Sequence, residues 1–372
     1  MRPTRAEIDL SAVSYNIAQI KKKVAPADIM AVVKADGYGH GMVQVARCAV
    51  KNGINFLAVE LIEEAVTLRE NGITTPILVF GFAIPELTPV FVEHDLTATI
   101  YEWRSAEALE KAAAAAGKRV PVHINVDTGM GRAGVDWQSA AALLHRMQSL
   151  QHINIEGIYT HYPTSDERDR SFAELQIARL SEVLHKLEAE GIRIPIVHTA
   201  NSGAILDLPN SYFNYVRPGA LLYGFYPSTE TSESIDIKPA MSIKSQVVQM
   251  KEIGRGTSVG YGRTFIAEAP TKITTLPMGY ADGYRHLLSN KGEVLIRGRR
   301  YPIIGRVCMD LIMIDLGAET DVEIGDEVVV LGTQGKETIS VYSLAEKCNT
   351  LPYEITCAIS KRVPRVYLNG DE

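Results

Sequence analysis

Residues 31–41 read AVVKADGYGHG, a short apolar run that ends at Lys34 and passes into glycines and aromatic residues. Ala31, Val32 and Val33 have the character of a strand buried on both faces, as in a parallel sheet. A charged ammonium at the end of such a strand must be partnered, neutralised or exposed in a pocket. A solvated surface lysine is the alternative, since lysines usually lie at protein surfaces. The choice depends on what surrounds this stretch in the rest of the chain.

The pattern of a short apolar run followed by a longer helical stretch recurs through the first two thirds of the sequence. Strands are predicted at residues 29–33, 56–59, 77–80, 96–100, 121–126, 154–160, 194–198 and 214–217. Helical stretches that follow them include ELIEEAVTLREN (60–71), SAEALEKAAAAAG (105–117) and SFAELQIARLSEVLHKLEAEG (171–191). An introductory strand at residues 6–10 and a helix from Ser11 precede the series. Eight such strand-helix units predict a (β/α)8 barrel of the TIM type.

The texture of the sequence changes at about residue 236, where short alternating strands are separated by glycines. Examples are MSIKSQVVQM (241–250), GEVLIRGRRYPIIG (292–305) and DEVVVLG (326–332). This pattern is typical of small barrels and sandwiches and predicts a mainly β domain. The polar stretch STETSES (228–234) marks the junction. The fold class is therefore expected to be α/β, with a barrel over 1–235 and a mainly β carboxyl-terminal domain over 236–372.

The composition of the 372-residue chain is that of an ordinary globular protein and excludes several functions. The formal net charge is -6, and no basic stripe interleaved with aromatics appears, so no nucleic acid is expected as a partner. The sequence shows neither a secretory signal nor an apolar stretch long enough to span a membrane. Four scattered cysteines fit neither a disulfide framework nor a zinc site, and paired histidines at metal-ligand spacing are absent. We expect a cytoplasmic protein without a bound metal.

Active sites of (β/α)8 barrels lie at the carboxyl ends of the strands, so the residues that follow each predicted strand are candidates. These residues are Lys34, Asp127, Arg132, His161, Asn201, Ser202, Arg217 and Gly219. The loops after strands seven and eight hold phosphate in many such barrels, and NSGA (201–204) and RPGALLYG (217–224) have the small residues that this requires. A phosphate site together with a lysine suggests pyridoxal phosphate, whose aldehyde reacts with a lysine amine.

The sequence resembles the alanine racemase family, whose members use pyridoxal phosphate bound in a barrel. Matching motifs run in family order along the whole chain. They are AVVKADGYGHG (31–41), HINVDTGMGRAG (123–134), THYPTSDE (160–167), ANSGAIL (200–206), VRPGALLYG (216–224), VGYGRTF (259–265), GYADGY (279–284), GRVCMDLIMIDL (305–316) and YEITCAISKRVPRVY (353–367). The resemblance implies interconversion of L-alanine and D-alanine, which supplies D-alanine for peptidoglycan in the cell wall.

The resemblance also implies a role for individual residues. Lys34 is implied as the Schiff-base lysine and Arg217 as the contact of the pyridine nitrogen. The phosphate is implied to be held by Tyr38, Ser202, Gly219, Ala220 and Tyr353, with Asn201 and His161 also in the cofactor site. Tyr261 is implied as the second catalytic base, and Arg132 and the Met309 backbone as the binding site of the substrate carboxylate. In the family's head-to-tail homodimer, Tyr261, Met309 and Asp310 of one subunit complete the site of the other.

Racemisation removes the α-proton from one face and returns a proton to the other, so two bases on opposite faces are sufficient. Lys34 and Tyr261 can supply them, although the phenol needs a nearby positive charge from Arg132 or His161. Asn125 departs from the family pattern, in which many members have a carbamylated lysine; either Asn125 itself or a bound chloride is expected to orient Arg132. The alternatives are a serine or broad-specificity racemase of the same family, an ornithine-type decarboxylase, and a non-catalytic pyridoxal-phosphate carrier.

Overall fold

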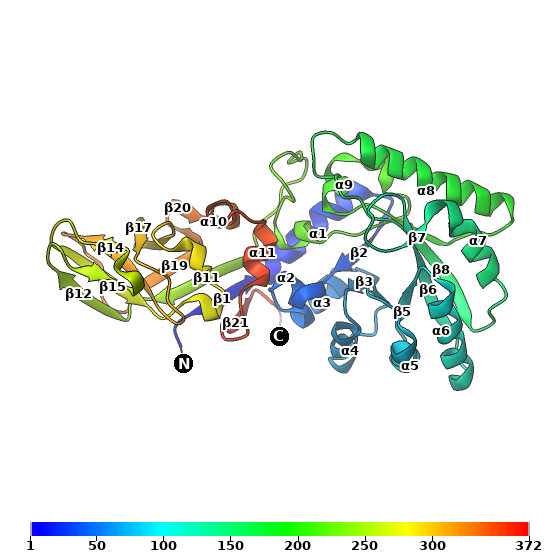
Figure 1. The fold of residues 1–372 in the computed structure, drawn as a ribbon, viewed down its shortest axis with the longest axis horizontal. Helices are drawn as coiled ribbons and strands as arrows, with labels where there is room; N and C mark the ends of the chain where they lie inside the picture. The colour runs from blue at the N-terminus through cyan, green and yellow to red at the C-terminus, as the bar shows by residue number, and fades with distance from the viewer. Residues whose placement is uncertain (1, 371–372) are drawn as a thin grey trace. The chain divides into compact units, whose positions relative to one another are not determined.

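A computed structural model describes residues 2–370, which form two compact units (Figure 1). One unit comprises residues 12–37 and 42–238, and we call it the barrel unit. The other comprises the residues up to Ser11, residues 38–41 and the chain from Pro239 onward, and we call it the β unit.

The barrel unit contains a closed ring of parallel strands. Its strands are β2 (Asp28–Val32), β3 (Phe56–Val59), β4 (Ile77–Val79), β5 (Thr97–Ile100), β6 (Val120–Asp127), β8 (Ile153–Tyr159), β9 (Ile196–His198) and β10 (Tyr215–Val216). Neighbours pair in chain order, β10 returns to β2, and the short β7 (Val135–Asp136) adds to the side of β6. Each of these eight strands overlaps one of the runs predicted from the sequence. The predicted (β/α)8 barrel is confirmed.

Helices follow most barrel strands (Figure 1), although the short α2 (Lys34–Tyr38) is a turn with positive φ at Ala35, Asp36 and Gly37. They are α1 (Leu10–Val24), α2 (Lys34–Tyr38), α3 (Met42–Lys51), α4 (Ile62–Glu70), α5 (Thr88–Glu93), α6 (Trp103–Ala116), α7 (Trp137–Met147), α8 (Ser171–Ala189) and α9 (Ser202–Asp207), with the 3-10 turns η1 (Pro85–Leu87), η2 (Pro209–Ser211) and η3 (Ala220–Tyr223). The alanine run of 112–116 is the end of α6, which stops at Gly117 in the left-handed conformation that glycine adopts most easily. Strands β3, β4 and β5 are buried along their whole length, as expected for strands covered on both faces.

The β unit is built on a ten-stranded sheet. Its strands are β1 (Arg5–Asp9), β11 (Met241–Gln246), β12 (Gln249–Ile253), β15 (Thr271–Leu276), β16 (Glu293–Ile296), β17 (Arg299–Ile304), β18 (Ile312–Gly317), β19 (Glu327–Gln334), β20 (Glu337–Ile339) and β21 (Arg365–Leu368). The introductory strand β1 pairs antiparallel with β11 and parallel with β21. The predicted mainly β domain is confirmed.

Short elements complete the β unit. They are the hairpin β13 (Ser258–Val259) and β14 (Phe265–Ile266), the helices α10 (Val341–Cys348) and α11 (Pro352–Cys357), and the 3-10 turns η4 (Tyr261–Arg263), η5 (Tyr280–Asp282) and η6 (His286–Leu288). A buried cluster of Ile253, Val259, Ala267, Ile273 and Ile304 supports the hairpin. The hairpin that carries Tyr261 is therefore anchored in an apolar core.

Candidate active site

Lys34 lies directly after β2, at the carboxyl end of the barrel where the sequence predicted it. Its Nζ is 2.7 Å from Oε2 of Glu60, which follows β3, and 5.9 Å from the centroid of the Phe80 ring after β4. The three side chains come from neighbouring strands of the sheet, whose carboxyl ends lie side by side. Because the Lys34 side chain is one third exposed, its amine can reach a ligand from this end of the barrel.

Arg217 is nearly buried just beyond β10, and the walls of the barrel hold its guanidinium. Its NH1 donates to Nδ1 of His198 at 2.7 Å and to the carbonyl of the same residue. Its NH2 donates to the carbonyls of Thr160 at 2.7 Å and Thr199 at 3.0 Å. Among the described residues none accepts from the Nε–H, so this donor remains available for an acceptor such as a pyridine nitrogen. Burial lowers the pKa of Arg217 to about 10, and the group stays charged at neutral pH.

A buried chain of hydrogen bonds extends from Arg217 into the barrel. His198 Nε2 is 2.7 Å from Nδ1 of His123, and His123 Nε2 is 3.6 Å from a carboxylate oxygen of Glu156. Since an arginine only donates, Nδ1 of His198 must accept, and its Nε2–H then donates to His123. The Nε2–H of His123 is left to point at Glu156. Burial lowers the pKa of both imidazoles, so the chain is neutral between the arginine and the carboxylate.

Ser202 and Gly219 meet at the ends of β9 and β10. The buried Ser202 hydroxyl accepts from the amides of Gly219 at 3.1 Å and Leu221 at 3.4 Å, so its own hydrogen can be donated to a ligand oxygen. Ala220 follows directly as the first residue of η3. Asn201 caps α9 instead, because its Oδ1 accepts from the Ala204 amide and the Ser165 hydroxyl. Ser202 and Gly219 thus lie in contact, and their role in holding a phosphate stays a prediction.

His161 and Arg132 follow β8 and β6. Burial and the positive charges of Arg217, Arg132 and Lys34 hold the pKa of His161 well below its usual range. His161 is therefore neutral at neutral pH and does not provide the positive charge that a phenolic base needs. Arg132 is exposed on a loop shaped by Asp127, whose Oδ1 accepts from two amides of the same loop.

Five of the predicted site residues lie in the β unit. The Tyr38 and Tyr353 rings meet edge to face, with centroids 6.3 Å apart. Tyr261 is 72% exposed and Met309 is 52% exposed, which is unusual for large apolar side chains. Asp310 accepts from Arg362 at 2.5 Å, and the Met309 carbonyl accepts from the amide of Ala281 at 3.0 Å. Tyr38 and Tyr353 thus lie together within the β unit, and their contact with a phosphate stays a prediction.

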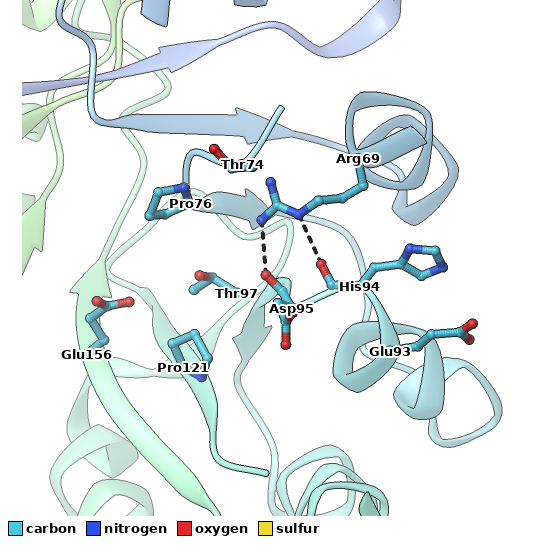
Figure 2. Close-up of a pocket in the computed structure, with 9 residues that line it drawn as sticks. All are labelled: Arg69, Thr74, Pro76, Glu93, His94, Asp95, Thr97, Pro121 and Glu156. Atoms are coloured by element: carbon cyan, nitrogen blue, oxygen red, sulfur yellow. Dashed lines mark hydrogen bonds between the residues drawn. The ribbon is translucent and has the colours of Figure 1, made fainter. Parts of the chain in front are cut away.

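The barrel unit also has a pocket of ≈ 440 Å³ at the opposite end of its strands. It is lined by Arg69, Thr74, Pro76, Glu93, His94, Asp95, Thr97, Pro121 and Glu156 (Figure 2). Figure 2 shows Arg69 reaching the carbonyls of His94 and Asp95, at 3.0 Å each. The carbonyls of Ile73 and Thr75 accept from the same guanidinium. Arg69 therefore connects the loop before β4 to the loop before β5 by hydrogen bonds. Residues at the amino ends of barrel strands serve stability, and we do not take this pocket as the active site.

Several residues that surround the candidate site were missed from the sequence. Glu60 follows the second barrel strand and satisfies the same positional rule as Lys34. His123 and His198 lie within strands, where polar residues in apolar runs were the available signal. Tyr159 ends β8 and stacks on His198 with ring centroids 4.8 Å apart. Burial raises the pKa of Tyr159 to about 12, so its phenol stays protonated.

No group of three or more His, Cys, Asp or Glu side chains within residues 2–370 is arranged to hold a metal ion. In the same range, no helix has both the length and the apolar character needed to cross a membrane.

Comparison with known proteins identifies the family. The model of the alanine racemase N-terminal domain matches residues 8–227, and that of the alanine racemase C-terminal domain matches residues 240–367. "Alanine racemase 2" of Caldanaerobacter subterraneus is 45% identical over 374 residues, which cover 100% of this chain and 96% of that protein. The structure of alanine racemase from Clostridium difficile 630 superposes with a TM-score of 0.95 at 35% identity, covering 98% of this chain and 96% of the other. Histidine racemase from Leuconostoc mesenteroides superposes with a TM-score of 0.92 at 28% identity, covering 99% and 98% of the two chains. The order of motifs, the barrel with its β unit and these full-length matches agree, and the chain belongs to the alanine racemase family.

Proposed function

We propose that this protein interconverts L-alanine and D-alanine with the help of pyridoxal phosphate, and so supplies D-alanine for peptidoglycan. The observation that carries the proposal is the group formed by Lys34, Arg217 and Ser202 at the carboxyl end of one barrel. These side chains offer an amine, a spare N–H for a ring nitrogen and a hydroxyl for a phosphate, which are the three contacts that pyridoxal phosphate needs. Membership of the alanine racemase family supports the same assignment.

When bound, pyridoxal phosphate withdraws electrons and stabilises negative charge on the α-carbon of an amino acid. Lys34 would hold the cofactor through its amine, and Arg217 would donate its Nε–H to the ring nitrogen. Because an arginine keeps its proton, Arg217 would leave a ring nitrogen unprotonated and the cofactor a weaker electron sink, which would favour prompt return of a proton to the substrate.

The phosphate and the substrate carboxylate have separate sets of ligands in this proposal. The phosphate would be held by Tyr38, Asn201, Ser202, Gly219, Ala220 and Tyr353, with His161 nearby. Since the Asn201 side chain is occupied as a helix cap, its contribution comes from positioning Ser202. The substrate carboxylate would be bound by Arg132 and the Met309 backbone.

Lys34 and Tyr261 act as the two bases in our proposal. Lys34 takes the α-proton from one face or returns it there, and the Tyr261 phenol does the same on the other face. Arg132 provides the positive charge that makes the phenol a usable base, because His161 is neutral. Incubation with L-alanine in deuterated water tests the scheme: α-deuteration and loss of optical rotation should occur together. Exchange without racemisation would refute the assignment of two bases.

We propose a head-to-tail homodimer with shared active sites. In this arrangement residues 1–235 form the barrel that binds the cofactor, and residues 236–372 contribute Tyr353 to the phosphate and Tyr261, Met309 and Asp310 to the partner's site. The high exposure of Tyr261 and Met309 supports the proposal, since apolar side chains of this size are usually covered. Mixing Lys34→Ala protein with Tyr261→Phe protein should restore activity, because each heterodimer has one intact site. Absence of activity in mixtures with confirmed subunit exchange would contradict shared sites.

A serine or broad-specificity racemase is the second candidate. The similarity to a histidine racemase at 28% identity supports this second candidate, because it shows that the same fold can act on amino acids with different side chains. The ratio of kcat/KM for L-alanine, L-serine and L-lysine decides between the candidates. A preference for L-alanine of less than about tenfold, equal to about 1.4 kcal/mol, would favour broad specificity.

Two smaller assignments complete the proposal. Asn125 or a bound chloride orients Arg132, and dependence of activity on chloride distinguishes the two. The cytoplasm is the proposed location, because the four cysteines are too few and too scattered in the sequence for a disulfide framework.

A further inference from the structure

The proposed two-base mechanism assigns no role to the contact between Glu60 and Lys34. The carboxylate oxygen Oε2 of Glu60 lies 2.7 Å from Nζ of Lys34, within the range of a charge-assisted hydrogen bond. The side chains are 46% and 33% exposed, so both groups face an open space rather than a sealed core. The same exposure makes an incidental surface ion pair the competing explanation.

The backbone on both sides of this contact is fixed, which argues against an incidental pair. Glu64, in the first turn of α4, accepts from the amide of Ala35 at 2.6 Å through Oε1. Its other oxygen, Oε2, accepts from the amides of Glu60 at 3.0 Å and Leu61 at 3.1 Å. One carboxylate thus joins the residue after Lys34 to Glu60 itself. The two side chains start from anchored positions, and less conformational entropy is lost when they pair.

The charged groups of the candidate site bear on the contact between Glu60 and Lys34. Besides burial, the positive charges of Arg217, Arg132 and Lys34 lower the pKa of His161. The negative charge of Glu60 contributes, after burial, to the raised pKa of Tyr159. Among the described residues, Glu60 is the one carboxylate that pairs with Lys34. The 2.7 Å contact places the negative charge of Glu60 directly against the Lys34 ammonium.

We propose that Glu60 is the counter-ion and positioning residue of Lys34, which orients Nζ and stabilises its ammonium form. The inference rests on the proposed role of Lys34 as a base. In that role the α-proton moves to Nζ, the electron pair of the broken C–H bond stays on the substrate carbon, and the amine becomes an ammonium. Glu60 neither gains nor loses a proton in this step. Its carboxylate stabilises the charge that appears on Nζ.

The test measures the reactivity of Lys34 itself in the full-length protein freed of cofactor. Pyridoxal reacts with an unprotonated amine, and borohydride reduction followed by peptide mass spectrometry counts the labelled Lys34. The variants are Glu60→Gln, which removes the charge and keeps the shape, and Glu63→Gln as a matched control. Glu63 is an exposed acid three residues after Glu60, and among the described residues Lys34 pairs with Glu60 and not with Glu63.

We expect Glu60→Gln to be labelled about two- to fivefold faster than wild type at pH 7, the range set by a partly exposed ion pair. The difference should narrow in about 1 M salt, which screens a partly exposed ion pair, and Glu63→Gln should follow wild type throughout. In the holoenzyme, kcat should fall by a similar factor with KM for alanine unchanged.

Two results would overturn the inference: equal labelling of Glu60→Gln and wild type at pH 7, or an acceleration that is unchanged in about 1 M salt, which would indicate altered access rather than a lost charge. The role of Lys34 is tested separately, because Lys34→Ala should abolish racemisation whatever Glu60 does.

Discussion

Gly157 offers a sharp test of the buried chain that ends at Arg217. This glycine lies on β8 against the fully buried His123, and a Cβ built on it would be 2.6 Å from three atoms of the imidazole ring. Ordinary contacts of a Cβ begin at about 3.4 Å, so the ring must move by roughly 0.8 Å to admit Gly157→Ala. The backbone of Gly157 has no left-handed φ, and the substitution therefore tests packing alone.

The expected cost has two parts. Overpacking a buried site costs about 1–3 kcal/mol. Moving the ring also lengthens the 2.7 Å hydrogen bond between His123 and His198, which is worth about 1 kcal/mol. We expect Gly157→Ala to lower the free energy of unfolding by about 2–4 kcal/mol. Because His198 contacts Arg217, we also expect weaker binding of pyridoxal phosphate.

Urea unfolding followed by circular dichroism measures the effect, and Gly254→Ala is the control. A Cβ at Gly254 meets nothing within 4 Å, and its φ is not left-handed, so this variant should unfold like wild type or be slightly more stable. Equal unfolding midpoints for Gly157→Ala and Gly254→Ala would refute the tight packing of Gly157 against His123.

Three further predictions concern pH, a hydroxyl and a strained turn. Burial lowers the pKa of His198 well below that of an unfolded histidine. The neutral His198 therefore contributes its full stability above about pH 6.5. Below that pH, the free energy of unfolding falls by up to about 1.4 kcal/mol per pH unit, because the unfolded state binds a proton that the folded state does not. Urea titrations of wild type and His198→Gln at pH 7.5 and 5.5 should show a smaller loss in the variant, and equal losses would contradict this. Ser202→Ala leaves two amides without their acceptor and should lower the free energy of unfolding by about 1–2 kcal/mol, measured by urea unfolding. Cofactor binding should also weaken in an absorbance titration. An unchanged urea midpoint would contradict this prediction. Ala35→Gly should raise the free energy of unfolding by about 0.5–1 kcal/mol because it relieves a left-handed φ of 53°, whereas a loss of stability in the same urea assay would show that the conformation is not strained.

The fold was largely predictable because its signal is local. Each barrel strand is an apolar run of a few residues between polar ends, and the predicted strand at 29–33 differs from β2 by one residue at each end. The pairing of β1 was not predictable in the same way. Arg5 lies opposite Lys244 in the sheet, and nothing in a five-residue strand specifies a partner so distant in sequence. The division of function at residue 235 stays a prediction.

Site residues that follow the end of a strand could be predicted from the sequence. Site residues that meet only through the register of neighbouring strands could not. Lys34 and Arg217 were found because they follow strands. His123 and His198 were not, because a strand buried on both faces gives no alternation that distinguishes the inside of the barrel from the outside. Their contact requires β6, β8 and β9 to lie in the observed order, which only the closed sheet determines.

The turn after Lys34 shows why sequence rules fail at this site in particular. Ala35, Asp36, Gly37 and Tyr38 all have φ between 52° and 61°, although only one of them is a glycine. Each other residue pays about 1–2 kcal/mol for this conformation, so propensity alone predicts a different turn.

Specific hydrogen bonds hold the chain in that turn. The Ala35 amide donates to Glu64 at 2.6 Å, the Gly37 amide to the Val33 carbonyl at 2.9 Å, and the Met42 amide to Asp36 at 3.0 Å. Strain that is held by surrounding contacts is typical of functional sites. Here it follows Lys34 directly, and the Glu64 carboxylate that holds the turn also holds the backbone of Glu60. The strained turn and the ion pair therefore have one common support, and we expect loss of the Glu64 carboxylate to disturb both.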